Sequence, residues 1–103
     1  MRFTLQWIAA IGLLACAGPA RADYDLVVKK NCLACHQIDK RKYGPNFKEV
    51  AAKYADQKGA AEMLAKKIRR GGTGVWGQDV MPPQSQVSAT DARALANYVL
   101  SLK

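Results

Sequence analysis

Hydrophobic residues recur at helical spacing along most of the chain after residue 22. No alternating apolar pattern is long enough for a pair of strands, so the periodicity predicts an all-α protein built from four to five short helices. Four sets of residues share predicted helix faces: Tyr24, Val27 and Val28; Phe47, Val50, Ala51 and Tyr54; Met63, Leu64 and Ile68; and Leu95, Tyr98, Val99 and Leu102.

Capping signals mark where these helices begin and end. Asn46 suits the N-cap of the second helix, and Ser88, followed three residues later by Asp91, resembles a capping box before the last. The Gly71-Gly72 pair should end the third helix. Residues 71–87 then show no periodicity, and a structureless loop of that length in a small domain is usually functional. We expect a cofactor packed under this loop to organise it.

The first 22 residues have a different character. A basic start precedes an apolar run from Phe3 to Ala17, and Ala20-Arg21-Ala22 then places small residues where signal peptidase reads them. The apolar run is too short to span a bilayer. We therefore predict a cleaved secretory signal peptide over residues 1–22, export to the periplasm, and one mature domain over residues 23–103. A lipoprotein-like box ending in Cys16 leaves a lipid-anchored form as an alternative.

The size and charge of the mature domain narrow the range of possible functions. The mature domain has about 81 residues, and a core that small needs a covalent or metal staple. The chain has 16 basic and 8 acidic residues, and the mature part keeps an excess of positive charge that favours anionic partners. The basic residues are scattered and not interleaved with aromatic residues, so nucleic acid is a poor candidate. A solvated face that keeps the protein soluble is the alternative.

Residues Cys32-Leu33-Ala34-Cys35-His36 form a C-x-x-C-H pattern, which is typical of covalent haem attachment. Two thiols one helical turn apart can add to the two vinyl groups of the porphyrin. The adjacent imidazole of His36 then reaches the iron from the same side. We therefore predict one haem c bound through Cys32 and Cys35, with His36 as an iron ligand.

Three other readings of the cysteine pair fit less well. A zinc site needs four ligands, and His36 is the only histidine of the chain. A thioredoxin-like redox pair needs a neighbouring strand, helix and strand. A structural disulfide between Cys32 and Cys35 would close a loop too short to stabilise the fold much.

The second axial ligand should be a methionine, because no second histidine exists. Met1 belongs to the predicted leader, and Met63 has the spacing of a core residue. Met81 lies in the long loop and is followed by Pro82 and Pro83, whose fixed φ angles stiffen the chain. Ligation by His36 and Met81 would close both faces of the iron and raise its reduction potential.

Two more residues have candidate roles beside the haem. The backbone carbonyl of Pro45 could accept the ring N–H of His36 and fix its orientation. The indole N–H of Trp76 needs a partner when buried, and a haem propionate is one candidate; a plain core aromatic is the other reading.

These residues resemble class I cytochrome c, specifically its short bacterial subgroup of periplasmic electron carriers. The resemblance covers residues 23–103 and rests on the haem motif and on Tyr43-Gly44-Pro45, Val50-Ala51-Ala52-Lys53-Tyr54, Gly74-Val75-Trp76-Gly77, Met81-Pro82-Pro83 and the last helix. It implies a cytochrome c fold with crossed terminal helices around one haem. It also implies that His36 and Met81 are the axial ligands, that Pro45 supplies the carbonyl to His36, and that Trp76 binds a propionate.

The chain departs from that subgroup around the predicted ligand loop. Residues Gln78-Asp79-Val80 lack the prolines found in many relatives, Gln84 stands where relatives often have asparagine, and the loop is one residue longer. A basic residue placed near a propionate in relatives would correspond to Lys67.

Together these features predict a soluble monohaem electron carrier and not an enzyme. The expected partners are redox proteins with acidic docking surfaces, with a respiratory complex as electron donor and a terminal oxidase or reductase as acceptor. The protein itself is expected to be a monomer that does not insert stably into a membrane. Transfer would be outer-sphere, at an exposed haem edge. Two alternatives are a dedicated haem subunit of a larger oxidoreductase and a haem-based sensor or peroxidase in which Met81 does not bind iron.

Overall fold

A computed structural model gives the fold and describes residues 19–103. Its elements are α1 (Pro19–Lys29), the 3₁₀ turn η1 (Cys32–Ala34), α2 (Phe47–Lys53), α3 (Ala60–Arg70) and α4 (Ala89–Leu100). These described residues form no β-strand, so the prediction of an all-α protein with four to five short helices is confirmed. Most of the predicted signal peptide, Cys16 included, lies outside the described residues, and the predicted cut before Asp23 falls within α1.

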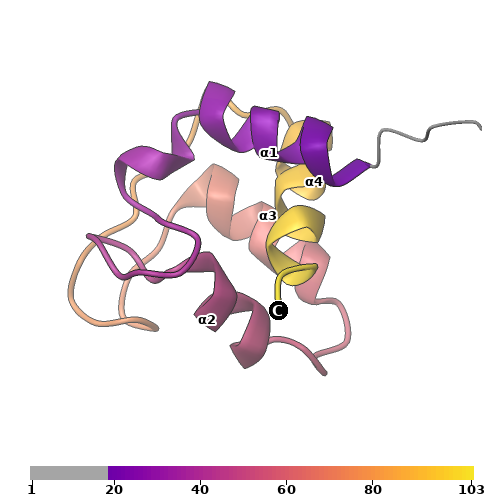
Figure 1. The fold of residues 1–103 in the computed structure, drawn as a ribbon. Helices are drawn as coiled ribbons and strands as arrows, with labels where there is room; N and C mark the ends of the chain where they lie inside the picture. Colours follow the sequence, from indigo (N-terminus) through magenta and orange to yellow (C-terminus); the bar gives the residue numbers. More distant parts are fainter. Residues whose placement is uncertain (1–18) are drawn as a thin grey trace, which may run out of the picture.

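Helix α4 is the centre of the fold. It packs against α1, α2 and α3, and Figure 1 shows α1 crossing it near its first turns. Ala92 and Ala96 are completely buried, and their small side chains let the neighbouring helices approach closely. The core around α4 also holds Val27, Phe47, Val50, Val87, Leu95, Tyr98 and Val99. The crossed terminal helices implied by the family resemblance are therefore present.

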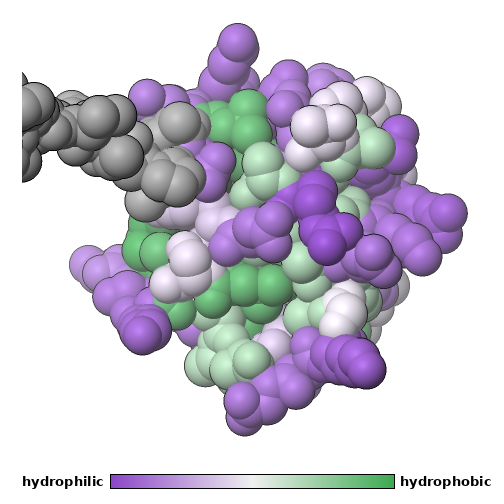
Figure 2. Space-filling model, turned by 90° about the vertical axis from the view of Figure 1, so that its right-hand side faces the viewer, coloured by the Kyte–Doolittle hydropathy of each residue, from purple (hydrophilic) through white to green (hydrophobic). Residues whose placement is uncertain are grey.

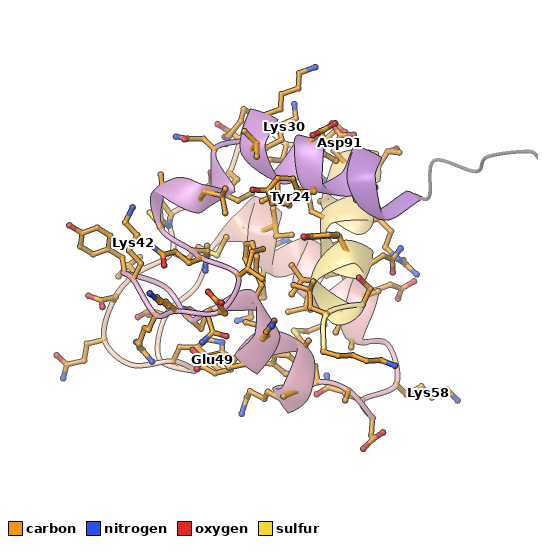
Figure 3. All side chains as sticks on the ribbon, in the orientation of Figure 1. Tyr24, Lys30, Lys42, Glu49, Lys58 and Asp91 are labelled. Atoms are coloured by element: carbon orange, nitrogen blue, oxygen red, sulfur yellow. The ribbon has the colours of Figure 1, made fainter. Side chains whose placement is uncertain are left out.

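The predicted face of α1 is only partly correct. Val27 is 1% exposed, but Val28 is 52% exposed, so the prediction that Val28 faces the core is wrong. The buried face of α1 is centred on Leu26 and Val27, which are the residues that pack on the core. Tyr24 lies at the edge of this face, with its ring 6.4 Å from that of Tyr98 on α4 (Figure 3).

The two predicted caps differ in completeness. At α2, the Asn46 side chain accepts a 2.7 Å hydrogen bond from Glu49 N, and the Glu49 carboxylate accepts one of 3.1 Å from Asn46 N. This is a full capping box, whereas the sequence indicated only the Asn46 cap. At α4, Ser88 accepts from Asp91 N at 3.1 Å, but the Asp91 carboxylate instead lies 3.7 Å from Lys30 Nζ (Figure 3).

Helix α3 ends where the glycines predict. Gly71 follows Arg70 with a φ of 73°, and its N–H donates to Lys67 O at 2.8 Å. Leu64 and Ile68 pack on the core. Met63 is half-buried and borders a surface hollow with Lys66 and Arg70, so core packing, the role predicted for Met63, is not what the structure shows.

The surface is rich in polar and charged side chains. On the face shown in Figure 2, hydrophilic side chains project around the outline, with apolar patches between them. In the part of the chain from residue 19 onward, no helix combines the length and apolarity needed to cross a bilayer.

The capping box gives a stability prediction. Asn46→Ala removes the side-chain acceptor for Glu49 N, and we expect a loss of about 1 kcal/mol in the free energy of unfolding. Asn97→Ala is the matched control, because Asn97 is exposed within α4. Denaturant unfolding followed by circular dichroism measures both. Equal stability of the two variants would contradict a role for the box.

Candidate haem-attachment site

The turn η1 places the two cysteines at the end of α1. It is closed by hydrogen bonds from Cys35 N and His36 N to Cys32 O, at 3.2 and 3.0 Å. Asn31, directly before it, has the left-handed backbone conformation, with a φ of 65°. Cys32 is half-buried and Cys35 is exposed, and no disulfide joins them. Burial raises the pKa of the Cys32 thiol, so it lacks the lowered pKa typical of a reactive redox cysteine.

The His36 ring is held by one polar contact. Its Nδ1 lies 2.8 Å from the carbonyl oxygen of Pro45. Because a carbonyl can only accept, Nδ1 carries a proton, and in the neutral ring Nε2 is then the nitrogen with the lone pair. This is the tautomer that a metal-ligating histidine requires, with the second ring nitrogen fixed by a backbone acceptor.

Gly44 leaves room for the His36 ring. A Cβ built on Gly44 would overlap the imidazole, at 2.6 Å from Nδ1 and 3.1 Å from Nε2. No real Cβ atom fits at such a distance, so glycine is required by the close approach and not by its φ angle. Sequence reasoning missed this role, although Gly44 directly precedes the proline that it singled out.

Phe47 covers the ring from α2. The two rings are stacked, with centroids 5.1 Å apart and planes 23° apart. The intervening chain is tied down by hydrogen bonds from Gly44 N to Cys35 O (2.8 Å), Phe47 N to Gln37 O (2.9 Å) and Lys48 N to Ile38 O (3.0 Å). The loop over residues 37–46 therefore closes back on the haem motif and fixes the direction of the His36 ring.

Met81 is anchored through its backbone to the end of α3. Gly72 and Met81 form an isolated antiparallel bridge, with hydrogen bonds of 3.0 and 2.8 Å in the two directions. Gly71 lies against the carbonyl of Met81. A Cβ added to Gly71 would be 2.9 Å from the nitrogen of Pro83. The side chain of Lys67 lies over Gly72, beside the same bridge. The Met81 side chain is half-buried.

Hydrogen bonds connect the chain after Met81 to α3 and to the segment before the haem motif. Gln84 N donates to Ile68 O at 3.1 Å, and the Gln84 amide donates to Pro82 O at 2.9 Å. Gln86 and Lys30 exchange hydrogen bonds of 3.3 and 3.4 Å. The Gln84 side chain thus binds the carbonyl of Pro82, which is a different contact from the sulfur contact expected of an asparagine there.

Trp76 lies half-buried against the core. The guanidinium of Arg41 donates to its carbonyl oxygen, and Lys53 Nζ lies 5.7 Å from its ring centroid. Neither cation was predicted to act here, since both are remote from Trp76 in sequence. The contacts of Trp76 and Lys67 with a propionate stay predictions.

The donor set fits a covalently bound haem. It offers two cysteines on one turn that no disulfide joins, and an imidazole whose Nδ1 is held by a backbone carbonyl. Residues 19–103 contain no group of three or more His, Cys, Asp and Glu side chains that could hold a metal ion without a porphyrin.

Comparison with known proteins agrees with this site. The sequence model of the family described as Cytochrome c matches residues 24–103. Cytochrome c-552 of Nitrosomonas europaea is 54% identical over 99 residues, which cover 96% of this chain and 95% of that protein. Cytochrome c-551 of Pseudomonas aeruginosa is 44% identical over 102 residues, covering 98% and 97%.

The fold is also that of a solved relative. The crystal structure of wild-type Nitrosomonas europaea cytochrome c552 superposes with a TM-score of 0.76, covering 78% of this chain and 99% of that one. Sequence, fold and donor geometry thus agree: the chain belongs to the cytochrome c family, whose members are electron carriers, and it carries one haem c bound covalently through Cys32 and Cys35.

Proposed function

We propose that this protein is a periplasmic carrier of single electrons between respiratory redox proteins, with His36 and Met81 as the axial ligands of its iron. The observation that carries the proposal is the hydrogen bond of 2.8 Å between His36 Nδ1 and Pro45 O, because it leaves Nε2 as the ligating atom. Met81 is the best partner, since its loop is pinned to both α3 and the segment before the haem motif.

The chain's own residues hold the ligands still. The haem supplies a one-electron couple when bound. Phe47 and Gly44 confine the His36 ring, and Gly71, Gly72 and Pro83 confine the Met81 backbone. Fixed ligands change position little between the two oxidation states. Because His36 and Met81 would fill both axial positions of the iron, the proposed transfer is outer-sphere.

A basic and apolar face suits the proposed partners. Lys40, Arg41 and Lys42 follow one another in the loop after His36, next to Tyr43, which is 67% exposed. Arg41 joins this loop to the one that carries the exposed residues Val75 and Val80. An acidic partner surface with an apolar centre would match it in a small, brief contact of below about 1,200 Å².

Ligation by Met81 can be tested by spectroscopy. Ferric haem with a thioether ligand shows a weak sulfur-to-iron charge-transfer band in the near infrared. We expect the band in the purified protein, its complete loss in Met81→Ala, and its retention in Met63→Ala, which removes the other described methionine. A haem spectrum without the band in the unaltered protein would contradict the ligand assignment and favour a sensor or peroxidase.

Confinement of His36 by Gly44 gives a second test. Gly44→Ala forces the imidazole to shift, and we expect about 1 to 3 kcal/mol of destabilisation together with an altered haem spectrum. Gly59→Ala is the control: its Cβ would meet nothing within 4 Å, although its φ of 76° adds strain. The control should lose stability without any spectral change. An unaltered spectrum in Gly44→Ala would argue against a tightly confined ligand.

The docking face predicts a position-dependent charge effect. Lys42 and Lys58 lie on different sides of the molecule, at the left and lower right of Figure 3. We expect Lys42→Glu to slow electron transfer to an acidic redox partner by a factor of about 3 to 10 at low salt, with Lys58→Glu close to wild type. Stopped-flow kinetics at several ionic strengths measures this. Equal slowing would show that net charge alone matters.

A further inference from the structure

Residues 73–80 form a lobe that projects from the fold between Gly72 and Met81; we call it the Trp76 lobe. Its neck is the Gly72–Met81 bridge. Inside it, Gly74 N donates to Gly77 O at 3.1 Å, and the Thr73 hydroxyl lies 3.4 Å from two carbonyl oxygens of the same lobe. Apart from Trp76, its residues are exposed. The internal contacts shape the lobe but do not hold it against the rest of the molecule.

Two cations provide contacts from outside the lobe. The Arg41 guanidinium donates to the carbonyl of Trp76, and it lies beside Gly77, where an added Cβ would be 3.6 Å from Nη2. Lys53 Nζ lies 5.7 Å from the Trp76 ring centroid and 5.8 Å from that of Tyr54. Trp76 is thus contacted at its carbonyl by Arg41 and at its ring by Lys53, two cations from different segments.

We propose that Arg41, assisted by Lys53, is a positioning residue that clamps Trp76 and fixes the lobe against the loop that carries the Pro45 carbonyl. Arginine suits this task because its planar guanidinium offers several donors in a fixed geometry, and a charged donor strengthens a hydrogen bond to a neutral carbonyl. The ammonium of Lys53 adds a cation–π contact on the ring.

The clamp connects the two halves of the site. Arg41 belongs to the loop that closes over His36, whereas Trp76 belongs to the segment that leads to Met81. Loss of the contact would let water reach Trp76 and the haem edge proposed to lie beside it. This functional consequence rests on the proposed position of Trp76 beside the haem, whereas the clamp itself does not.

Hydrogen exchange tests the clamp on the intact haem protein. We expect Arg41→Ala to speed exchange of the amides in residues 73–80 about fivefold, the factor that corresponds to a net hydrogen bond of about 1 kcal/mol. Arg41→Lys should restore part of the protection. Lys42→Ala is the matched control, because it removes the same charge from the same loop and should leave exchange in the lobe unchanged.

Several results would overturn the clamp. These are unchanged exchange in Arg41→Ala, equal acceleration in Lys42→Ala, or the absence of a nuclear Overhauser contact between the Arg41 guanidinium and Gly77 in the unaltered protein. The last measurement needs no variant. Greater access of water should also lower the reduction potential of Arg41→Ala below that of Lys42→Ala. Faster exchange with equal potentials would support the clamp but refute its position beside the haem.

Discussion

The hydrogen bond between His36 Nδ1 and the Pro45 carbonyl is the interaction on which the site depends. It selects one tautomer of the imidazole and fixes the direction in which Nε2 points. The bond forms only because the loop after the haem motif returns to its starting point. That return is secured by Gly44 N on Cys35 O and by Phe47, whose side chain enters the core. The orientation of His36, the proposed ligand, and the packing of the core are therefore parts of one arrangement.

Met81 is positioned in a different way. Met81 lies in a loop, and its backbone is held by the two residues that follow α3. Its carbonyl approaches Gly71 too closely for a Cβ, and it forms a bridge with Gly72. Lys30 and Gln86 then connect the end of this loop to the segment before Cys32. The two proposed ligands are thus presented by loops whose ends are fixed on the same small helical core. A covalent cofactor adds the staple that a core of this size needs.

The charged side chains on the surface have different structural roles. The last turn of α3 carries Lys67, Arg69 and Arg70, which complement the negative end of the helix dipole. The Asn46–Glu49 box and the contact of Lys30 with Asp91 stabilise helix ends and their junctions. Arg41 and Lys53 instead gather on Trp76, far from them in sequence. An excess of positive charge therefore serves the fold as well as the proposed encounter with acidic partners.

The sequence alone determined the helical class, the Asn46 and Gly71 boundaries, the haem motif and the family. These follow from local signals: periodicity, capping chemistry and the spacing of Cys32, Cys35 and His36. Only the tertiary structure decided that Val28 faces outward, that Asp91 turns to Lys30, and that Gly44, Arg41 and Lys53 contact His36 or Trp76. The outward face of Val28 and the contacts of Asp91, Arg41 and Lys53 depend on which distant segment packs alongside, and the contact of Gly44 with His36 depends on how the short loop between them closes. A local pattern does not encode either direction of approach.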